Sequence, residues 1–156
     1  MTSDQNKEVV RRFFEELWND RRLELAEELI SDNCSTHQLR AEATDVGVPR
    51  APTSVKHEMV EWLTGFPDIR FRIEQIIAEG DRVVSHCTIL GKHSGQWSGV
   101  ESTGRSVEFP MIVIHRLENG KIVEDWVLVG ALVLFQQLGL VHPTDALLAA
   151  GKAETS

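Results

Sequence analysis

The spacing of apolar residues changes near Ile69, and no other feature of the sequence constrains the fold as strongly. Upstream, apolar residues recur every three or four positions, the spacing that places them on one face of a helix. Downstream, Ile69, Phe71 and Ile73 alternate with charged residues, which is typical of a strand with one solvated face. Helices followed by a run of strands predict an α+β fold, with helices packed on one face of a curved sheet.

Three helices are expected before this change. Thr2 or Ser3 can cap the first, whose apolar stripe covers residues 9–18. The second is expected over residues 23–30, until Ser-Asp-Asn interrupts the pattern, and forms a helical hairpin with the first. The third is expected over residues 54–65, where a glycine suits the C-terminal cap.

Two stretches are expected to lack a long regular element. Residues 38–53 carry Gly and Pro without a sustained period, which predicts a loop long enough to form a lid or the rim of a pocket. Near the end of the chain, residues 144–149 are expected to form a short helix and residues 151–156 to be frayed. The interpretation is one domain over residues 1–140 followed by a tail over residues 141–156.

The strands after the change are expected to form an antiparallel meander. They begin near residues 69, 82, 106 and 122. Asn119-Gly120 separates the last two, and Asn-Gly between two apolar runs is a strong signal for a tight hairpin.

Pairing around Asn119-Gly120 predicts which side chains share a face. With these two residues as the loop, His115 lies opposite Glu124 and Val113 opposite Trp126. One face then holds Phe109, Met111, Val113, His115, Glu124, Trp126, Leu128 and Gly130. Both faces are largely apolar, so we expect helices over one and a second subunit against the other, giving a homodimer.

The composition argues against several classes of partner. The 156 residues include 16 Lys and Arg and 24 Asp and Glu, a net charge of -8 that does not suit a nucleic acid or an anionic membrane. The polar start and the lack of an apolar run of about 18 residues predict neither export nor membrane insertion, and hence a cytoplasmic protein. Cys34 and Cys87 lack the spacing of a zinc site, so we expect two reduced thiols and no metal.

Several segments, taken in order, carry a family resemblance. They are Asn6 to Asn19, Phe66-Pro67-Asp68-Ile69, Glu79-Gly80-Asp81-Arg82-Val83, Gly91-Lys92-His93-Ser94-Gly95, Gly99 with Ser102-Thr103-Gly104-Arg105, Asn119 to Trp126, and Gln136-Gln137-Leu138-Gly139. Each is weakly specific alone, but their order and spacing over nearly the whole chain resemble the SnoaL-like polyketide cyclases of the NTF2-like superfamily.

The resemblance implies a cone-shaped α+β fold, commonly dimeric, whose pocket holds a lipophilic substrate without metal or organic cofactor. It also implies ring closure by an intramolecular aldol reaction under acid/base catalysis. The family's essential Asp lies four residues beyond the Trp of a Glu-x-Trp segment, where this chain has Gly130. In the predicted register, Gly130 lies on the pocket face and enlarges the cavity.

The candidate catalytic residues are His115, His37 and Glu124. A carboxylate beside His115 would orient the imidazole and raise its pKa; the alternative is a structural cross-strand pair. His37 resembles the pocket-directed His after the family's helices, and otherwise it caps a helix or bonds a backbone carbonyl.

The candidate substrate-binding residues form an apolar wall, which otherwise is plain core. They are Trp126, Phe109, Met111, Leu128, Gly130, Trp62 and Phe13.

These features support one leading hypothesis and two alternatives. The first is a cofactor-independent cyclase or isomerase acting on a lipophilic carbonyl compound in polyketide or other secondary metabolism, such as antibiotic biosynthesis. The second is a non-catalytic binding module, which the missing Asp favours. The third is an epoxide hydrolase or hydroxylase variant, since the broader family includes both.

Overall fold

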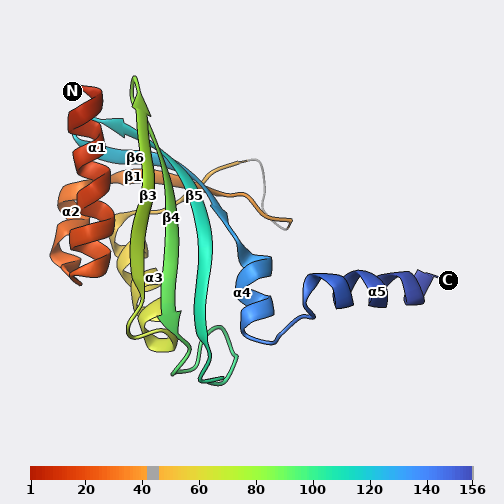
Figure 1. Cartoon of the computed structure of the whole chain (residues 1–156). Coiled ribbons are helices and arrows are strands. Elements are labelled where there is room, and N and C mark those ends of the chain that lie inside the picture. The colour runs from red at the N-terminus through yellow and green to blue at the C-terminus, as the bar shows by residue number, and fades with distance from the viewer. Residues whose placement is uncertain (42–45, 156) are drawn as a thin grey trace.

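The fold is a curved six-stranded sheet with helices packed against one face, seen in a computed structural model that describes residues 1–41 and 46–155 (Figure 1). The elements in chain order are α1 (Ser3–Arg12), η1 (Phe13–Asn19), η2 (Leu23–Leu25), α2 (Ala26–Leu29), β1 (Ile30–Gln38), β2 (Val48–Pro49), α3 (Pro52–Gly65), β3 (Arg70–Glu79), β4 (Arg82–Lys92), β5 (Ser106–Glu118), β6 (Lys121–Val129), α4 (Ala131–Gln137) and α5 (Thr144–Thr155). The strand order is β2-β1-β6-β5-β4-β3. The α+β prediction is confirmed.

The first helix begins where the sequence predicted and then changes its winding. The Thr2 hydroxyl accepts a hydrogen bond from the Gln5 N–H, and the Gln5 side chain accepts one from the Thr2 N–H, a capping box. From Phe13 the helix continues as the π-helix η1, whose i→i+5 pattern ends with the Asp20 N–H bonded to the Glu15 carbonyl. Within η1, four apolar side chains are buried, namely Phe13, Phe14, Leu17 and Trp18.

The second predicted helix is shorter than expected, and a strand follows it that the sequence analysis missed. One 3₁₀ turn and the four residues of α2 replace residues 23–30, and β1 begins at Ile30. This strand runs through Ser31-Asp32-Asn33 and pairs in parallel with β6. The strand lacks the regular alternation of apolar and polar residues that predicts a strand. Only some of its side chains are buried, Cys34 and Thr36 among them.

The predicted loop over residues 38–53 contains the short strand β2. Its residues 42–45 lie outside the described residues, but β2 pairs antiparallel with β1. The third helix begins at Pro52, a proline at its first turn, two residues before the predicted start. It ends at Gly65 as predicted, where a Cβ would lie only 2.3 Å from the Cβ of Trp97.

The strands from β3 to β6 form the predicted meander, but the chain after them differs. The last strand ends at Val129, and α4, a helix that the sequence analysis did not predict, begins at Ala131. The tail helix α5 continues to Thr155 and projects away from the sheet (Figure 1), where none of its described residues is buried.

The predicted hairpin is confirmed, but its register is wrong by one residue. Asn119 and Gly120 both have positive φ, 51° and 79°, as a type I′ turn requires. His115, however, pairs with Asp125 rather than with Glu124. The register shifts between Arg116 and Leu117, where β6 accommodates one extra residue in a β-bulge.

This one-residue shift reverses the faces assigned to β6, because successive side chains point to opposite sides of a sheet. The inner face, which packs on the helices, holds Met111, Val113, His115, Asp125, Val127 and Val129. Glu124, Trp126 and Leu128 lie on the outer face.

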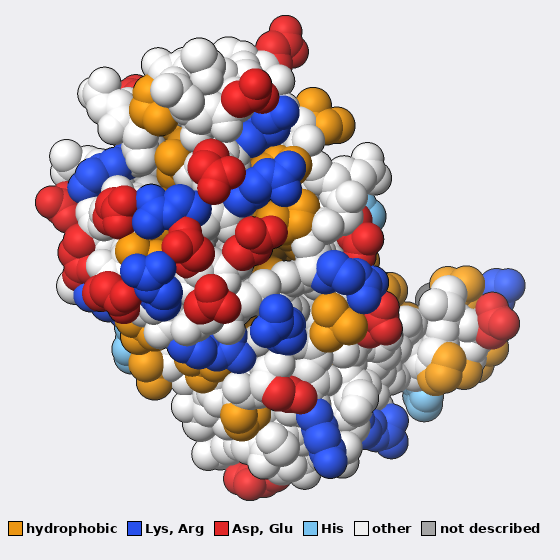
Figure 2. All heavy atoms as spheres, turned by 60° about the vertical axis from the view of Figure 1, so that its left-hand side comes forward, with side chains coloured by type: hydrophobic (Ala, Val, Ile, Leu, Met, Phe, Trp, Pro, Cys, Tyr) orange, Lys and Arg blue, Asp and Glu red, His pale blue; other side chains and the backbone are white. Residues whose placement is uncertain are grey.

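The helical side of the molecule carries charges of both signs. Figure 2 shows acidic and basic side chains interleaved there. Ion pairs account for several of them, including Arg12 with Glu16 and Glu28, and Lys56 with Glu27.

Candidate functional site

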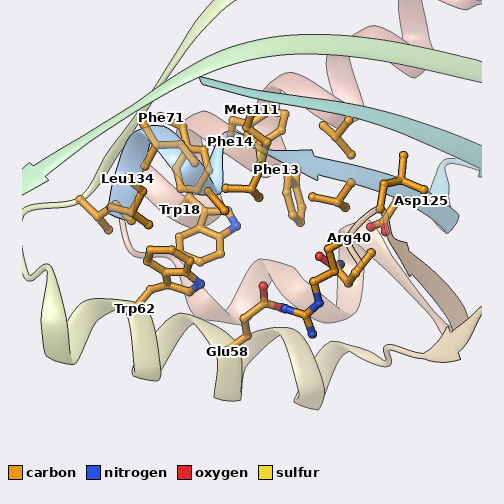
Figure 3. Close-up of a pocket in the computed structure, with 18 of the residues that line it drawn as sticks. Phe13, Phe14, Trp18, Arg40, Glu58, Trp62, Phe71, Met111, Asp125 and Leu134 are labelled. Atoms are coloured by element: carbon orange, nitrogen blue, oxygen red, sulfur yellow. The ribbon is translucent and has the colours of Figure 1, made fainter. Parts of the chain in front are cut away.

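A cavity of about 250 Å³ lies between the inner face of the sheet and the helices. Its wall is mainly aromatic and apolar (Figure 3), and includes Phe13, Phe14, Trp18, Trp62, Phe71 and Met111. The π-helix η1 supplies the first three of these. Leu134 and Phe135 of α4 close one side. Such a wall can enclose a small lipophilic molecule.

Charged side chains converge at the other end of the cavity, where Figure 3 shows Glu58 and Asp125. Asp125 is only 1% exposed, accepts a short hydrogen bond from the Thr36 hydroxyl, and accepts one from Arg50 Nη1 at 2.8 Å. The Arg50 guanidinium also donates to Glu58 Oε2, from Nη2 at 2.8 Å and from Nε at 3.1 Å.

Four separate elements position this cluster. Thr36 is the direct partner of Asp125 in the parallel β1–β6 pair, so the strand register brings hydroxyl and carboxylate together. Arg50 follows β2, and its backbone N–H donates to the Cys34 carbonyl at 2.7 Å. Glu58 lies on α3. Burial alone would lower the pKa of Arg50, but the carboxylates of Glu58 and Asp125 raise it above its usual value.

His115 lies beside this cluster on the inner face, directly across the strand pair from Asp125. Its ring packs edge-on against Phe13 and Phe14, with centroids 5.4 and 5.9 Å apart. Burial lowers its pKa from 6.5 to about 4; nearby Asp125 opposes this effect and Arg50 adds to it. The imidazole is therefore neutral at pH 7, so one of its nitrogens carries no proton.

The structure brings some of the predicted site residues together at the cavity. Phe13, Trp62, Met111 and His115 line it. Phe109 is buried in the core next to Trp62, with ring centroids 6.3 Å apart.

Four other predicted residues lie on the outer face, which corrects their placement in the pocket: His37, Glu124, Trp126 and Leu128. The His37 ring stacks on Trp126 at 5.0 Å, and its Nε2 lies 2.8 Å from Glu124 Oε2. That hydrogen bond, followed by one from Arg116, lowers the pKa of Glu124. Leu128 is on the same face and half exposed. The β-bulge turns Glu124, Trp126 and Leu128 to the outer face. His37 lies on that face because it pairs with Trp126.

Gly130 does not enlarge the cavity, which is a further correction. It caps α4, and its N–H donates to the Pro110 carbonyl at 2.8 Å. A Cβ at position 130 would lie 2.8 Å from the Pro110 ring. In this structure, a side chain here would therefore meet Pro110 instead of entering the cavity.

Sequence reasoning missed the cluster of Asp125, Arg50, Thr36 and Glu58. The only available signal was the adjacent acidic pair, Glu124 and Asp125, because one of the two must face inward on any strand. The choice between them depends on the bulge.

Neither cysteine is a candidate nucleophile. Cys34 and Cys87 are free thiols, and burial raises the pKa of each to about 12. In residues 1–41 and 46–155, no group of three or more His, Cys, Asp or Glu side chains is placed to hold a metal. No helix in the same part of the chain is long and apolar enough to cross a membrane.

Comparisons with known proteins show which family and which solved structures the chain resembles. The family model for SnoaL-like polyketide cyclases matches residues 8–138. The chain is 29% identical to IdmH of Streptomyces antibioticus, a proposed polyketide cyclase, over 86% of this chain and 99% of that one, with a TM-score of 0.74. It is 25% identical to AclR of Streptomyces galilaeus, a proposed hydroxylase, over 99% and 94% of the two chains, with a TM-score of 0.79.

A third structure supports the fold alone. It is a proposed SnoaL-like polyketide cyclase of Jannaschia, 23% identical over 89% of this chain and 94% of that one, with a TM-score of 0.76. No curated protein sequence matches the chain. These likenesses confirm the NTF2-like fold that the sequence resemblance implied.

Proposed function

Because the chain belongs to the SnoaL-like polyketide cyclase family, we propose that it is a cofactor-independent acid/base enzyme, a cyclase or isomerase of a lipophilic carbonyl compound. The observation that carries this proposal is a neutral, buried imidazole beside the Asp125–Arg50 ion pair at one end of an aromatic cavity. Family membership further supports a role in polyketide or other secondary metabolism, such as antibiotic biosynthesis, in the cytoplasm.

His115 is the proposed base. It removes a proton from a carbon next to a substrate carbonyl, and the C–H electron pair moves into an enolate. Arg50, which lines the cavity, donates a hydrogen bond to the enolate oxygen. The new negative charge stabilises the imidazolium beside it, which offsets the low pKa of His115 in the empty cavity.

Two outcomes then follow from the same intermediate. In a cyclase, the enolate carbon forms a bond to a second carbonyl carbon of the same molecule, and the imidazolium returns its proton to the resulting alkoxide. In an isomerase, the imidazolium returns the proton to a different carbon. Asp125, held by Thr36 and Arg50, keeps the guanidinium in place through both steps.

Deuterium exchange tests the shared first step without the natural substrate. The protein is incubated with 2-tetralone, a bicyclic ketone, in D₂O, and loss of the protons next to the carbonyl is followed by NMR. We expect exchange faster than in buffer, abolished by His115→Phe and unchanged by His86→Gln, which alters a histidine of the outer face. Binding without exchange in the unmodified protein would instead indicate a non-catalytic binding module.

Hydroxylation is the second candidate, favoured by the likeness to AclR over 99% of this chain. It would place one atom of O₂ in a substrate C–H bond as a hydroxyl, while the other atom leaves as water with two electrons from an added reductant such as a hydroquinone. Mass spectrometry of the product detects the added oxygen. Product formation that needs air and adds oxygen would support this candidate over proton transfer.

The outer face of the sheet supports a homodimer as part of the same proposal. It exposes large apolar side chains on three strands, with Ile77 62%, Ile112 47% and Leu128 50% exposed. A second copy covering this face would remove them from water. Light scattering coupled to gel filtration measures the mass directly, and a monomer at micromolar concentration would contradict the dimer.

A further inference from the structure

Two buried polar atoms on neighbouring strands have no hydrogen-bond partner in the described part of the chain. They are Ser85 Oγ on β4 and His115 Nδ1 on β5. Ser85 pairs with Val113, and Val83 pairs with His115. Ser85 and His115 are therefore diagonal neighbours, and both side chains point to the inner face.

The surroundings leave Ser85 Oγ and His115 Nδ1 few other partners. Ser85 is fully buried, and its direct partners across the two adjacent strands are Ile76 and Val113, both apolar. The His115 ring is held between the edges of Phe13 and Phe14. Buried polar groups are rarely left unpaired, and one buried water between two diagonal neighbours on the same face would satisfy both atoms.

A serine is an unexpected residue at this position. The inward side chains of β4 before and after it are Val83, Cys87 and Ile89, all buried in the core. An apolar residue at position 85 would continue this pattern and leave no hydroxyl unpaired. Burying a hydroxyl here costs free energy, because the group loses its hydrogen bonds to water. A hydrogen bond to a neighbouring group would offset that cost.

The orientation of the His115 ring decides which nitrogen is available to a substrate. The side chain lines the cavity while its Nδ1 is inaccessible to solvent, which leaves Nε2 as the nitrogen that can meet a substrate. For Nε2 to act as a base, it must be the nitrogen without a proton, and Nδ1 must then carry the proton. A neutral imidazole needs an acceptor at Nδ1 to hold that tautomer.

We propose that Ser85 is the positioning residue of His115: one buried water accepts the hydrogen bond from Nδ1–H and donates one to the Ser85 hydroxyl oxygen, which keeps Nε2 unprotonated towards the cavity. This inference rests on the proposed function, since it assigns His115 the role of base. Ser85 itself does not touch the substrate.

Long-range ¹H–¹⁵N correlation NMR on protein with ¹⁵N-labelled histidine tests the proposal, because it reports which ring nitrogen carries the proton. At pH 7, we expect the Nδ1–H tautomer of His115 in the unmodified protein. Ser85→Ala should lower the ratio of this tautomer to the other by about fivefold, the factor for one typical hydrogen bond. Cys87→Ala, a matched change at the next inward position of β4, should leave the ratio unchanged.

Two results would overturn the proposal: an Nε2–H tautomer in the unmodified protein, or the same tautomer ratio in Ser85→Ala. If Ser85→Ala does not fold, Ser85→Cys, whose thiol is a weaker hydrogen-bonding group, should lower the ratio in the same direction. The measurement needs no turnover. Failure of the 2-tetralone exchange in the unmodified protein would contradict the proposed function while the tautomer result still decides the role of Ser85.

Discussion

The buried His115 makes the stability of the protein depend on pH in a window that can be worked out in advance. Its pKa is about 4 in the folded protein and about 6.5 in an unfolded chain. Between these values, the unfolded state binds more protons than the folded state, so the free energy of unfolding rises with pH. The contribution is fully present above pH 6.5 and is lost as the pH falls through 4.

The magnitude follows from the same two values. One pKa unit of difference between folded and unfolded states corresponds to about 1.36 kcal/mol, so His115 contributes about 3 kcal/mol at neutral pH relative to acid. About 2 kcal/mol of this should disappear between pH 7 and pH 5, because the slope there approaches one proton.

Urea unfolding at a series of pH values measures this effect. Comparison with His115→Phe, which fills the site with a ring that does not titrate, cancels the contributions of the carboxylates common to both proteins. We expect the free energy of unfolding of the unmodified protein to fall by about 3 kcal/mol relative to this variant between pH 7 and pH 4. Parallel curves for the unmodified protein and His115→Phe would refute the reasoning.

Three further outcomes are expected. Arg50→Met, which leaves the Asp125 carboxylate buried without its cation, should lower the free energy of unfolding by about 3–5 kcal/mol, and a second change, Asp125→Asn, should recover part of the loss in a double-mutant cycle. Gly130→Ala should lower the thermal midpoint without affecting ligand binding, because its Cβ would lie 2.8 Å from the Pro110 ring; an unchanged midpoint would show that Pro110 yields freely. Ile112→Asp should yield a monomer in light scattering, and an unchanged dimer mass would exclude the outer face as the interface.

Much of the fold follows from local patterns in the sequence. The cap at Thr2, the end of α3 at Gly65 and the Asn119-Gly120 turn each depend on residues close in the chain. The resemblance to a family added the cone-shaped, NTF2-like form of this sheet. Local and family signals agree here, and the structure confirms both.

The elements that were missed depend on distant partners. The strand β1 is rich in polar residues, and it is extended because it pairs in parallel with β6. The sequence of residues 30–38 alone does not predict that pairing. The π-helix η1 is a second case, since its apolar residues fit an ordinary helix equally well. Tertiary packing, rather than intrinsic preference, decides such segments.

The strand neighbours of His115 were predicted in part, and the error has a single physical reason. An imidazole at position 115 beside a carboxylate of the opposite strand was expected and is present, but the carboxylate is Asp125 and not Glu124. When both faces of a strand are apolar, the spacing of its apolar residues does not reveal a β-bulge next to a tight hairpin. Arg50 was beyond prediction, because it reaches Asp125 from a segment 75 residues away.

Burial, rather than residue type, separates the two imidazole–carboxylate pairs that the bulge creates. On the outer face, His37 bonds Glu124 directly, and its ring is covered on one side by Trp126. On the inner face, Asp125 is already occupied by Thr36 and Arg50, so His115 receives no direct bond from its carboxylate neighbour and burial lowers its pKa. The inner pair therefore leaves a neutral nitrogen facing an apolar cavity, which is what proton abstraction from a lipophilic ketone requires.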